Sequence, residues 1–381
     1  MDAPVPAIPF NRPTVLGSEP DLIREVLAGD RWSGNGPLTR RCQDFFRDRY
    51  GLPRALLTGS CTDALEMAAL LTGVGPGDEV ILPSFTFVST ANAFALRGAT
   101  LRFADSLPDH PNLDPAQVES LLGDRTRVIV PVHYGGVACD MDTLLALAAR
   151  HGLRVVEDAA QCIEARHRGR QLGTLGQLGT FSFHETKNLH CGEGGLLLVN
   201  DPALAPRAEV IHEKGTNRAA FFRGEVDKYG WVDLGSSFLP SELQAAVLWA
   251  QLEHLEAVAG HRLALWERYR EGLQDLESGG HAQLPRIPAH AEHNGHIFYL
   301  VLPDLAARTA LIEHLKKRGV YAVFHYQSLH GSAYFRDRHD GRRLPQADRY
   351  SDCLLRLPLF HALSPTEQAR VVDAVRAFFG R

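Results

Sequence analysis

Excess positive charge is absent from this chain. The net charge is −5, and the longest Lys/Arg run is KKR at residues 316–318, which argues against the basic footprint of a nucleic-acid-binding protein. The sequence also lacks an apolar run as long as a membrane span, and its first residues, MDAPVPAIPFNRP, have neither the basic nor the apolar region of a signal peptide. We therefore expect a cytoplasmic protein with no membrane and no nucleic-acid partner.

Paired cysteine spacings and metal-binding motifs are missing as well. The six cysteines are scattered along the chain, at Cys42, Cys61, Cys139, Cys162, Cys191 and Cys353. This arrangement favours reduced thiols over a disulfide framework. The eighteen histidines include no HExxH motif, no CxxC accompanies them, and His190 beside Cys191 is not a ligand spacing. We predict that the protein holds no metal.

The sequence does contain a long alternation of strand-like and helical segments. Its 381 residues are 45% hydrophobic and 22% charged, enough for a large core and typical of two domains. Apolar runs at 55–59, 78–84, 100–105, 127–136 and 153–160 are expected to be strands, and segments 60–71, 87–98, 115–123 and 141–152 to be helices. This alternation predicts an α/β fold with a mainly parallel central sheet flanked by helices.

A second, smaller unit is expected after a long helical connector. Residues 241–276 have a helical pattern that we expect to be broken only at Gly260. Strands are expected at 296–303 and 321–330 and helices at 308–319 and 364–379, the last opened by Ser364 with Glu367 three positions later. We predict a large domain over residues 1–250 and a small C-terminal α/β domain over residues 251–381.

Two strand-to-helix corners have polar side chains where a parallel sheet places its ligands. Ser60, Cys61 and Thr62 follow the first strand and open a helix, so hydroxyls, free N–H groups and the helix dipole would form an anion cradle. Glu157 and Asp158 end another apolar strand, where a carboxylate facing a ring nitrogen would keep that nitrogen protonated. Both corners also fit ordinary helix caps.

A strand-to-helix corner with two phenylalanines and a loop with one lysine provide further candidate ligand-binding groups. Phe85 and Phe87 in LPSFTFVSTANA belong either to the core or, as a stacking ring, to a planar cofactor. In FSFHETKNLHCGEGG, Ser182 adds a hydroxyl, Lys187 an amine, and the glycines allow close approach of the backbone to a bulky neighbour. An amine, an anion cradle, an aromatic ring and a carboxylate match the aldehyde, phosphate, ring face and ring nitrogen of pyridoxal 5′-phosphate. The alternative is a solvated loop lysine.

The same segments carry a family resemblance that covers nearly the whole chain. SCTDALEMAALL, PSFTFVSTANA, VVEDAAQ, FSFHETKNLHCGEGG and GSSFLPSELQAA resemble, in order and spacing, the DegT family of nucleotide-sugar aminotransferases. The resemblance implies pyridoxal-phosphate fold type I, similar to aspartate aminotransferase. It also implies a homodimer in which each active site uses residues of both chains.

The resemblance assigns roles to individual cofactor-binding residues. It places the lysine that bonds to the cofactor at Lys187 and the partner of the ring nitrogen at Asp158. The remaining contacts fall on Gln161 for the ring hydroxyl, on Phe87 for stacking, on Cys61, Thr62 and Ser182 for the phosphate, and on Ser237 for the phosphate of the neighbouring subunit. Many relatives have Gly in place of Cys61 and Asn in place of Ser237.

The resemblance also implies the reaction. The expected substrates are glutamate, as amino donor, and a dTDP-4-keto-6-deoxyhexose, which would be aminated at C4. Basic and aromatic residues outside the cofactor motifs are candidates for the sugar nucleotide: Lys214, Arg218, His325 and Tyr326. Alternatives are amination of another nucleotide ketosugar, a sugar dehydratase, whose relatives have histidine at the lysine position, and a cofactor-binding regulator without turnover.

Overall fold

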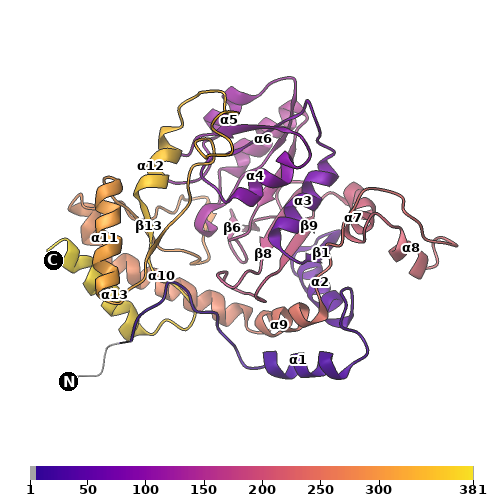
Figure 1. The fold of residues 1–381 in the computed structure, drawn as a ribbon, viewed down its shortest axis with the longest axis horizontal. Helices are drawn as coiled ribbons and strands as arrows, with labels where there is room; N and C mark the ends of the chain where they lie inside the picture. Colours follow the sequence, from indigo (N-terminus) through magenta and orange to yellow (C-terminus); the bar gives the residue numbers. More distant parts are fainter. Residues whose placement is uncertain (1–5, 381) are drawn as a thin grey trace.

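A seven-stranded sheet forms the centre of the computed structural model, which describes residues 6–380 (Figure 1). The strand order is β1-β9-β8-β5-β4-β2-β3, and only β9 runs against the others. The strands are β1 Arg54–Thr58, β2 Glu79–Pro83, β3 Thr100–Ala104, β4 Thr126–Ile129, β5 Arg154–Asp158, β8 Leu178–Ser182 and β9 Gly195–Val199. The expected α/β fold with a mainly parallel sheet is confirmed.

Helices cover both faces of this sheet and bury two apolar clusters against it. One face is covered by α2 Pro37–Tyr50, α5 Pro115–Leu121, α6 Met141–His151 and α9 Glu242–Leu252. The other is covered by α3 Cys61–Thr72, α4 Val88–Ala95, α7 Ala205–His212 and α12 Pro345–Cys353. Burial on both faces explains why these strands are continuously apolar rather than alternating. None of the helices within residues 6–380 combines the length and apolarity needed to cross a bilayer.

A third apolar cluster forms the core of the C-terminal part. The three-stranded sheet β11-β13-β12 packs with the long helix α10, and the elements are α10 Leu255–Ser278, β11 Tyr299–Val301, α11 Leu305–Lys317, β12 Val323–Phe324, β13 Leu354–Arg356 and α13 Pro365–Phe378. Ser364 and Glu367 form the expected capping box of α13. Ile8, from the other end of the chain, pairs with Val320 and belongs to this cluster. The domain division at residue 250 stays a prediction.

The remaining elements lie at the periphery. Helix α1 Glu19–Ala28 packs along α9, and a small sheet joins β6 Arg166–His167, β7 Arg170–Gln171 and β10 Ala291–Glu292. The short helix α8 Arg218–Phe222 and the loop that follows it project from the main body beside α7 (Figure 1).

Several sequence expectations about element boundaries were wrong, including the strand expected over 321–330, of which only Val323–Phe324 (β12) is a strand. The long helical run is interrupted at Glu253 and His254, between α9 and α10, whereas Gly260 lies inside α10. A glycine destabilises a helix by about 1 kcal/mol, and the burial of one face of α10 offsets this loss of stability. The strand expected over 127–136 ends at Ile129, because Pro131 lacks an N–H and Gly135 and Gly136 have φ values of 69° and 77°.

Candidate active site

The carboxyl ends of the parallel strands meet at one edge of the sheet, and a cavity of about 520 Å³ lies there. Nine of the residues expected to bind cofactor or substrate line this one cavity: Cys61, Thr62, Phe87, Asp158, Gln161, Ser182, Lys187, His325 and Tyr326. They come from the start of α3, the β2–α4 corner, the end of β5 and the residues after it, the end of β8 and the hairpin that follows it, and the segment after β12. The fold therefore brings together side chains separated by up to 265 positions in the sequence.

Lys187 lies near the tip of the hairpin that joins β8 to β9. Phe183 closes the hairpin by donating its N–H to the carbonyl of Gly194 and accepting from the N–H of Cys191. Asn188, the residue after Lys187, anchors the tip by donating to the carbonyl of Asn294 at 3.0 Å. The Lys187 side chain enters the cavity, and burial lowers the pKa of its ammonium group. A larger fraction of Lys187 is therefore the free amine near neutral pH than of an exposed lysine, and only the free amine can attack a carbonyl.

Asp158 points into the cavity from the last position of β5. Its Oδ2 accepts a hydrogen bond of 2.7 Å from Thr90, and its Oδ1 accepts one of 3.2 Å from the N–H of Ala160. Thr90 in turn contacts the hydroxyl of Thr86 at 2.9 Å. No lysine, arginine or histidine within residues 6–380 forms an ion pair with this buried carboxylate. It is therefore suited to a cation supplied by a ligand, such as a protonated ring nitrogen.

Glu157, the other candidate carboxylate of this strand, points away from the cavity because successive strand residues face opposite sides. It accepts N–H bonds from Gly173, Leu175 and Gly176 at 2.9, 2.6 and 2.7 Å, and lies 3.0 Å from Nε2 of His133. Glu157 is fully buried by these contacts. Its role is to hold the end of β5 and the 173–176 loop together.

The N-terminus of α3, where we expect an anion cradle, lines the cavity. Ser60 caps the helix by accepting from the N–H of Asp63, which leaves the N–H groups of the first turn directed at the cavity. The hydroxyl of Thr62 lies 2.8 Å from that of Ser89. Burial raises the pKa of Cys61 to about 12, so its thiol is neutral and does not oppose an anion. Hydroxyls and N–H groups here match the acceptor oxygens of a phosphate.

We expected the glycines of GEGG, residues 192–195, to let the backbone approach a bulky neighbour, and the structure places another part of the chain there. A Cβ on Gly195 would lie 2.3 Å from the carbonyl oxygen of Ser60 and 2.4 Å from the nitrogen of Cys61. Gly194 would similarly meet the sulfur of Cys191. The bulky neighbour is thus the chain itself, and glycine allows β9 to lie directly against the start of α3.

Aromatic and amide groups line the remaining wall. The Phe87 side chain is 54% exposed, whereas Phe85 is buried in the core, so Phe87 is the ring with a free face. Tyr326 lies with its ring centroid 6.0 Å from that of Phe87, and its hydroxyl accepts from Gln161 Nε2 at 3.2 Å. The Gln161 Oε1 accepts from the N–H of Gly135 at 2.6 Å. One Nε2 hydrogen of Gln161 remains for a ligand.

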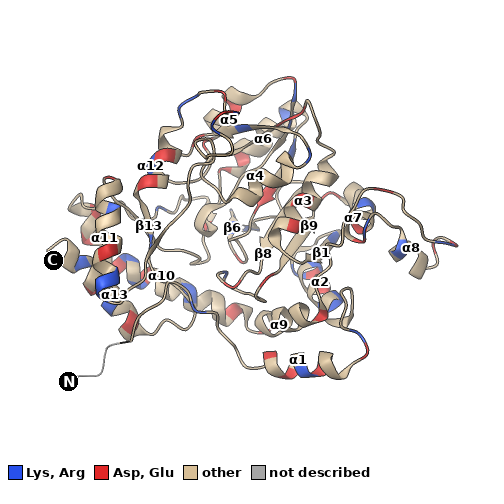
Figure 2. Ribbon diagram, in the orientation of Figure 1, with Lys and Arg blue, Asp and Glu red and all other residues tan. Residues whose placement is uncertain are grey.

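Three of the expected site residues do not line this cavity. Ser237, Lys214 and Arg218 line a second cavity of about 840 Å³ beside α7 and α8. Basic residues outnumber acidic ones in its lining, and α2, α7 and α8 carry blue Lys and Arg segments beside red ones in Figure 2. The arginines that line it are Arg31, Arg40, Arg47, Arg54, Arg218 and Arg223.

Several cavity residues were missed by the sequence analysis. Thr90 lies in the quoted segment PSFTFVSTANA, three positions beyond Phe87, so helical spacing offered a signal for it. His133, His296 and Arg356 follow from no local motif, because their approach to Lys187 depends on the long-range arrangement of the chain.

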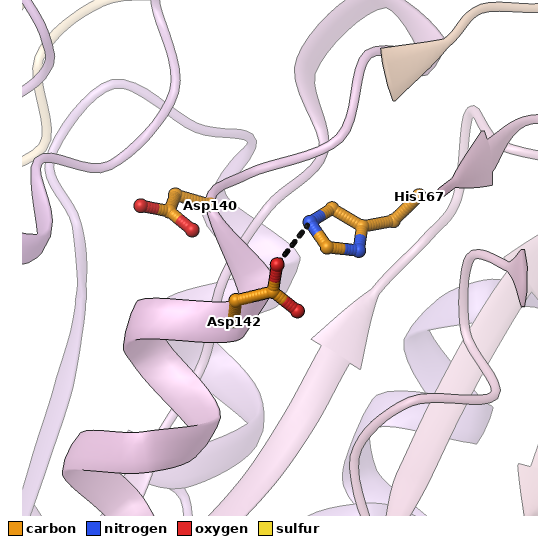
Figure 3. Close-up of side chains that lie close together, drawn as sticks. All are labelled: Asp140, Asp142 and His167. Carbon is orange, nitrogen blue, oxygen red and sulfur yellow. Dashed lines mark ion pairs between the residues drawn. The ribbon is translucent and has the colours of Figure 1, made fainter. Parts of the chain in front are cut away.

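One group outside the cavity has the composition of a cation site. The ligand atoms of Asp140, Asp142 and His167 lie within 4.8 Å of one another (Figure 3). Asp140 caps α6 by accepting from Thr143, and Asp142 Oδ2 lies 2.7 Å from Nε of Arg168. These contacts account for both carboxylates as a helix cap and a surface ion pair, and the absence of a bound metal stays a prediction.

The Asp158 geometry generates a testable prediction about charge. Asp158→Asn keeps the shape but removes the charge that stabilises a protonated ring nitrogen, so turnover should fall by orders of magnitude while cofactor still binds. Thr90→Val removes one hydrogen bond to the carboxylate and should lower kcat about tenfold, whereas Thr90→Ser should retain most activity. Cofactor absorbance and single-turnover rates provide the measurements. Near-normal turnover of Asp158→Asn would refute this assignment.

Comparisons with known proteins identify the family of this chain. The model of the DegT/DnrJ/EryC1/StrS aminotransferase family matches residues 17–376. The structure is similar to the aminotransferase TlmJ from Streptoalloteichus hindustanus, with 34% identity, a TM-score of 0.90, and coverage of 98% of this chain and 99% of that one. It is also similar to S. venezuelae DesV in complex with a ketimine intermediate, with 34% identity, a TM-score of 0.91, and coverage of 99% and 100%.

A more distant structure shares the fold. Helicobacter pylori PseC, an aminotransferase involved in the biosynthesis of pseudoaminic acid, is 21% identical, with a TM-score of 0.88 and coverage of 98% of this chain and 99% of that one. The family match over nearly the whole chain decides the assignment. The protein belongs to the DegT/DnrJ/EryC1/StrS aminotransferase family and is a sugar aminotransferase that uses pyridoxal 5′-phosphate.

Proposed function

We propose that this enzyme moves the amino group of glutamate to the 4-keto carbon of a dTDP-4-keto-6-deoxyhexose, giving dTDP-4-amino-4,6-dideoxygalactose for a cell-surface polysaccharide such as lipopolysaccharide. The observation that carries the chemistry is the single cavity shared by Lys187, Asp158 and the α3 anion cradle. The choice of sugar is supported by the segments RVIVPVHYGGVACDMDT and EKGTNRAAFFRGEVDKYGWVDLGSS, which resemble those of transaminases that make this product. All six cysteines are free thiols, which suits a cytoplasmic enzyme.

The residues of the cavity have separate tasks in this reaction. Bound pyridoxal phosphate supplies an electron sink that acidifies the amino-bearing carbon. Asp158 keeps the ring nitrogen protonated, the α3 N-terminus holds the phosphate, and Phe87 presents its ring face. Lys187, with its lowered pKa, is the amine that bonds to the cofactor and then moves a proton to and from the reacting carbon. The sugar face that Lys187 reaches sets the configuration of the product amine.

Product analysis tests the proposed substrate. Purified enzyme with pyridoxal phosphate, glutamate and dTDP-4-keto-6-deoxyglucose should give a 4-amino sugar nucleotide with the galacto configuration, identified by mass spectrometry and NMR. Omission of glutamate is the control. An amine at C3, an equatorial amine at C4, or loss of water without amination would identify another ketosugar aminotransferase or a dehydratase. No turnover of any ketosugar would favour the regulator alternative.

We also propose that the enzyme is a homodimer in which each chain completes the active site of the other. A group of large apolar side chains in and after α8 is strongly exposed: Phe222, Tyr229, Trp231, Val232 and Leu234, with Trp231 reaching 80%. Such a patch is typical of a protein–protein contact. Ser237, Lys214 and Arg218 lie beside it, so a second copy covering the patch would receive these groups at its own cavity.

Mixing two inactive variants tests this arrangement. Lys187→Ala destroys a chain's own site, whereas Lys214→Ala with Arg218→Ala should weaken sugar-nucleotide binding at the partner's site. After unfolding and refolding together, half of the dimers are mixed and each contains one intact site, so roughly a quarter of wild-type activity should return. Each variant refolded alone is the control. If Lys214 and Arg218 served their own chain, the mixture would gain nothing.

A further inference from the structure

Ser84 joins the corner that carries Phe87 to the segment that carries Tyr326. It follows β2 directly and is fully buried. Its carbonyl oxygen accepts from the N–H of Leu329 at 2.9 Å, and its Oγ accepts from the N–H of His330 at 3.3 Å. The same Oγ lies 2.7 Å from Nδ1 of His330. One serine therefore fixes two consecutive residues of a segment that is distant in the sequence.

This Ser84–His330 contact lies close in sequence to two rings of the active-site wall. Phe87 follows Ser84 by three positions, and Tyr326 precedes His330 by four. Both rings line the cavity, and their centroids lie 6.0 Å apart. Phe87 belongs to the β2–α4 corner of the large sheet, whereas Tyr326 belongs to the segment after β12 of the small sheet. The contact therefore sets the spacing of two rings that come from different parts of the fold.

The hydrogen-bond pattern assigns the protons of this contact. The Ser84 hydroxyl accepts from the N–H of His330, and its only other hydrogen bond within residues 6–380 is the one to Nδ1, so its own proton is directed at Nδ1. Nδ1 is then a bare acceptor, and the neutral ring carries its hydrogen on Nε2, which lies 3.6 Å from Oδ1 of Asp348. A second proton on the ring would occupy Nδ1 and leave the buried hydroxyl of Ser84 without an acceptor.

The groups that surround His330 favour the neutral ring. Burial lowers the pKa of His330, and the neighbouring His339, with its ring centroid 5.0 Å away, and Arg342 act in the same direction. The carboxyl groups of Asp348 and Asp105 act against them. Because the resulting pKa lies below the ordinary value of 6.5, the ring is neutral at neutral pH and gains its charge only at a pH below 6.5.

We propose that Ser84 and His330 are positioning residues for the aromatic wall of the active site. They act through the rings of Phe87 and Tyr326, the first facing the cofactor and the second facing the sugar nucleotide, and touch neither ligand themselves. The amine and the carboxylate of the reaction are held by other elements, the β8–β9 hairpin and β5. The proposal rests on the proposed function for the sugar nucleotide alone, since the family establishes the cofactor.

Steady-state kinetics of Ser84→Ala at pH 8, with saturating pyridoxal phosphate, provide the first test. The KM for the ketosugar should rise roughly tenfold while kcat changes less than about twofold, because the variant loosens a binding wall and leaves the reacting groups in place. The visible circular dichroism of the bound cofactor, which depends on the groups packed against its ring, should weaken as well. Ser106→Ala is the matched control, since Ser106 is a buried serine just beyond β3 whose hydroxyl has no hydrogen-bond partner within residues 6–380.

The pH dependence of the same KM provides the second test. His330→Asn places an amide oxygen near the position of Nδ1, so it can accept from Ser84 but cannot gain a proton. The KM of the wild-type protein should rise as the pH falls below 6.5, whereas that of His330→Asn should stay level over the same range. His339→Asn should keep the wild-type rise, because His339 contacts the carbonyl of Arg342 and not Ser84.

Three results would overturn the proposal: an unchanged KM in Ser84→Ala, a fall in kcat as large as the rise in KM, or the same pH dependence in His330→Asn as in the wild type. If Ser84→Ala does not fold, the comparison of His330→Asn with the wild type decides alone. If the wild-type protein does not aminate the proposed ketosugar, the proposed substrate is wrong. The pair is then judged by the cofactor's circular dichroism and its pH dependence in the same variants.

Discussion

The buried carboxylate of Glu157 fixes the geometry on which the active site depends. Three N–H groups of the 173–176 loop and the Nε2 of His133 surround it, and no other strand-end carboxylate described here has as many partners. Because Glu157 is held on one side of β5, its neighbour Asp158 must point to the other side. His133 contacts Glu157 and also lines the cavity, so the same interaction ties the β4–α6 connection to the site.

The cavity that results is organised by charge. Lys187 and Arg356 line it as basic groups and Asp158 as an acidic one, and none of the three forms an ion pair within residues 6–380. A protonated ring nitrogen is the group that would balance Asp158. Burial makes each unpaired charge costly and strengthens its interaction with a ligand group of opposite charge. The lowered pKa of Lys187 follows from the same burial.

The strands, their helices and the polar corners of the sheet could be predicted from the sequence, since each is a local pattern. Ser60, Phe87 and Lys187 stand where an apolar run ends, and parallel strands bring such ends to one edge. The wrong expectations about element boundaries also have local causes. The end of β4 at Ile129 depends on Pro131 and two left-handed glycines, and the interruption of the long helical run falls at Glu253 and His254 instead of Gly260.

Other features could not be predicted because they depend on tertiary contacts. The sequence does not show which of Glu157 and Asp158 faces the cavity, since both directions are compatible with a strand end. Arg356 lies in an ordinary apolar segment, LLRLPL, and reaches the site only because the small sheet packs over the large one. The second cavity, around Ser237, has its proposed role in substrate and cofactor binding only when a second chain is present.

The central claim is that the fold holds Lys187 as the amine that bonds to the cofactor. Borohydride reduction of the protein loaded with pyridoxal phosphate, followed by proteolysis and peptide mass spectrometry, tests it directly. The account predicts one modified peptide, with the reduced pyridoxyl group on Lys187, and its absence in Lys187→Ala. A pyridoxyl group fixed stoichiometrically on any other lysine, or persistence of the adduct in Lys187→Ala, would contradict it.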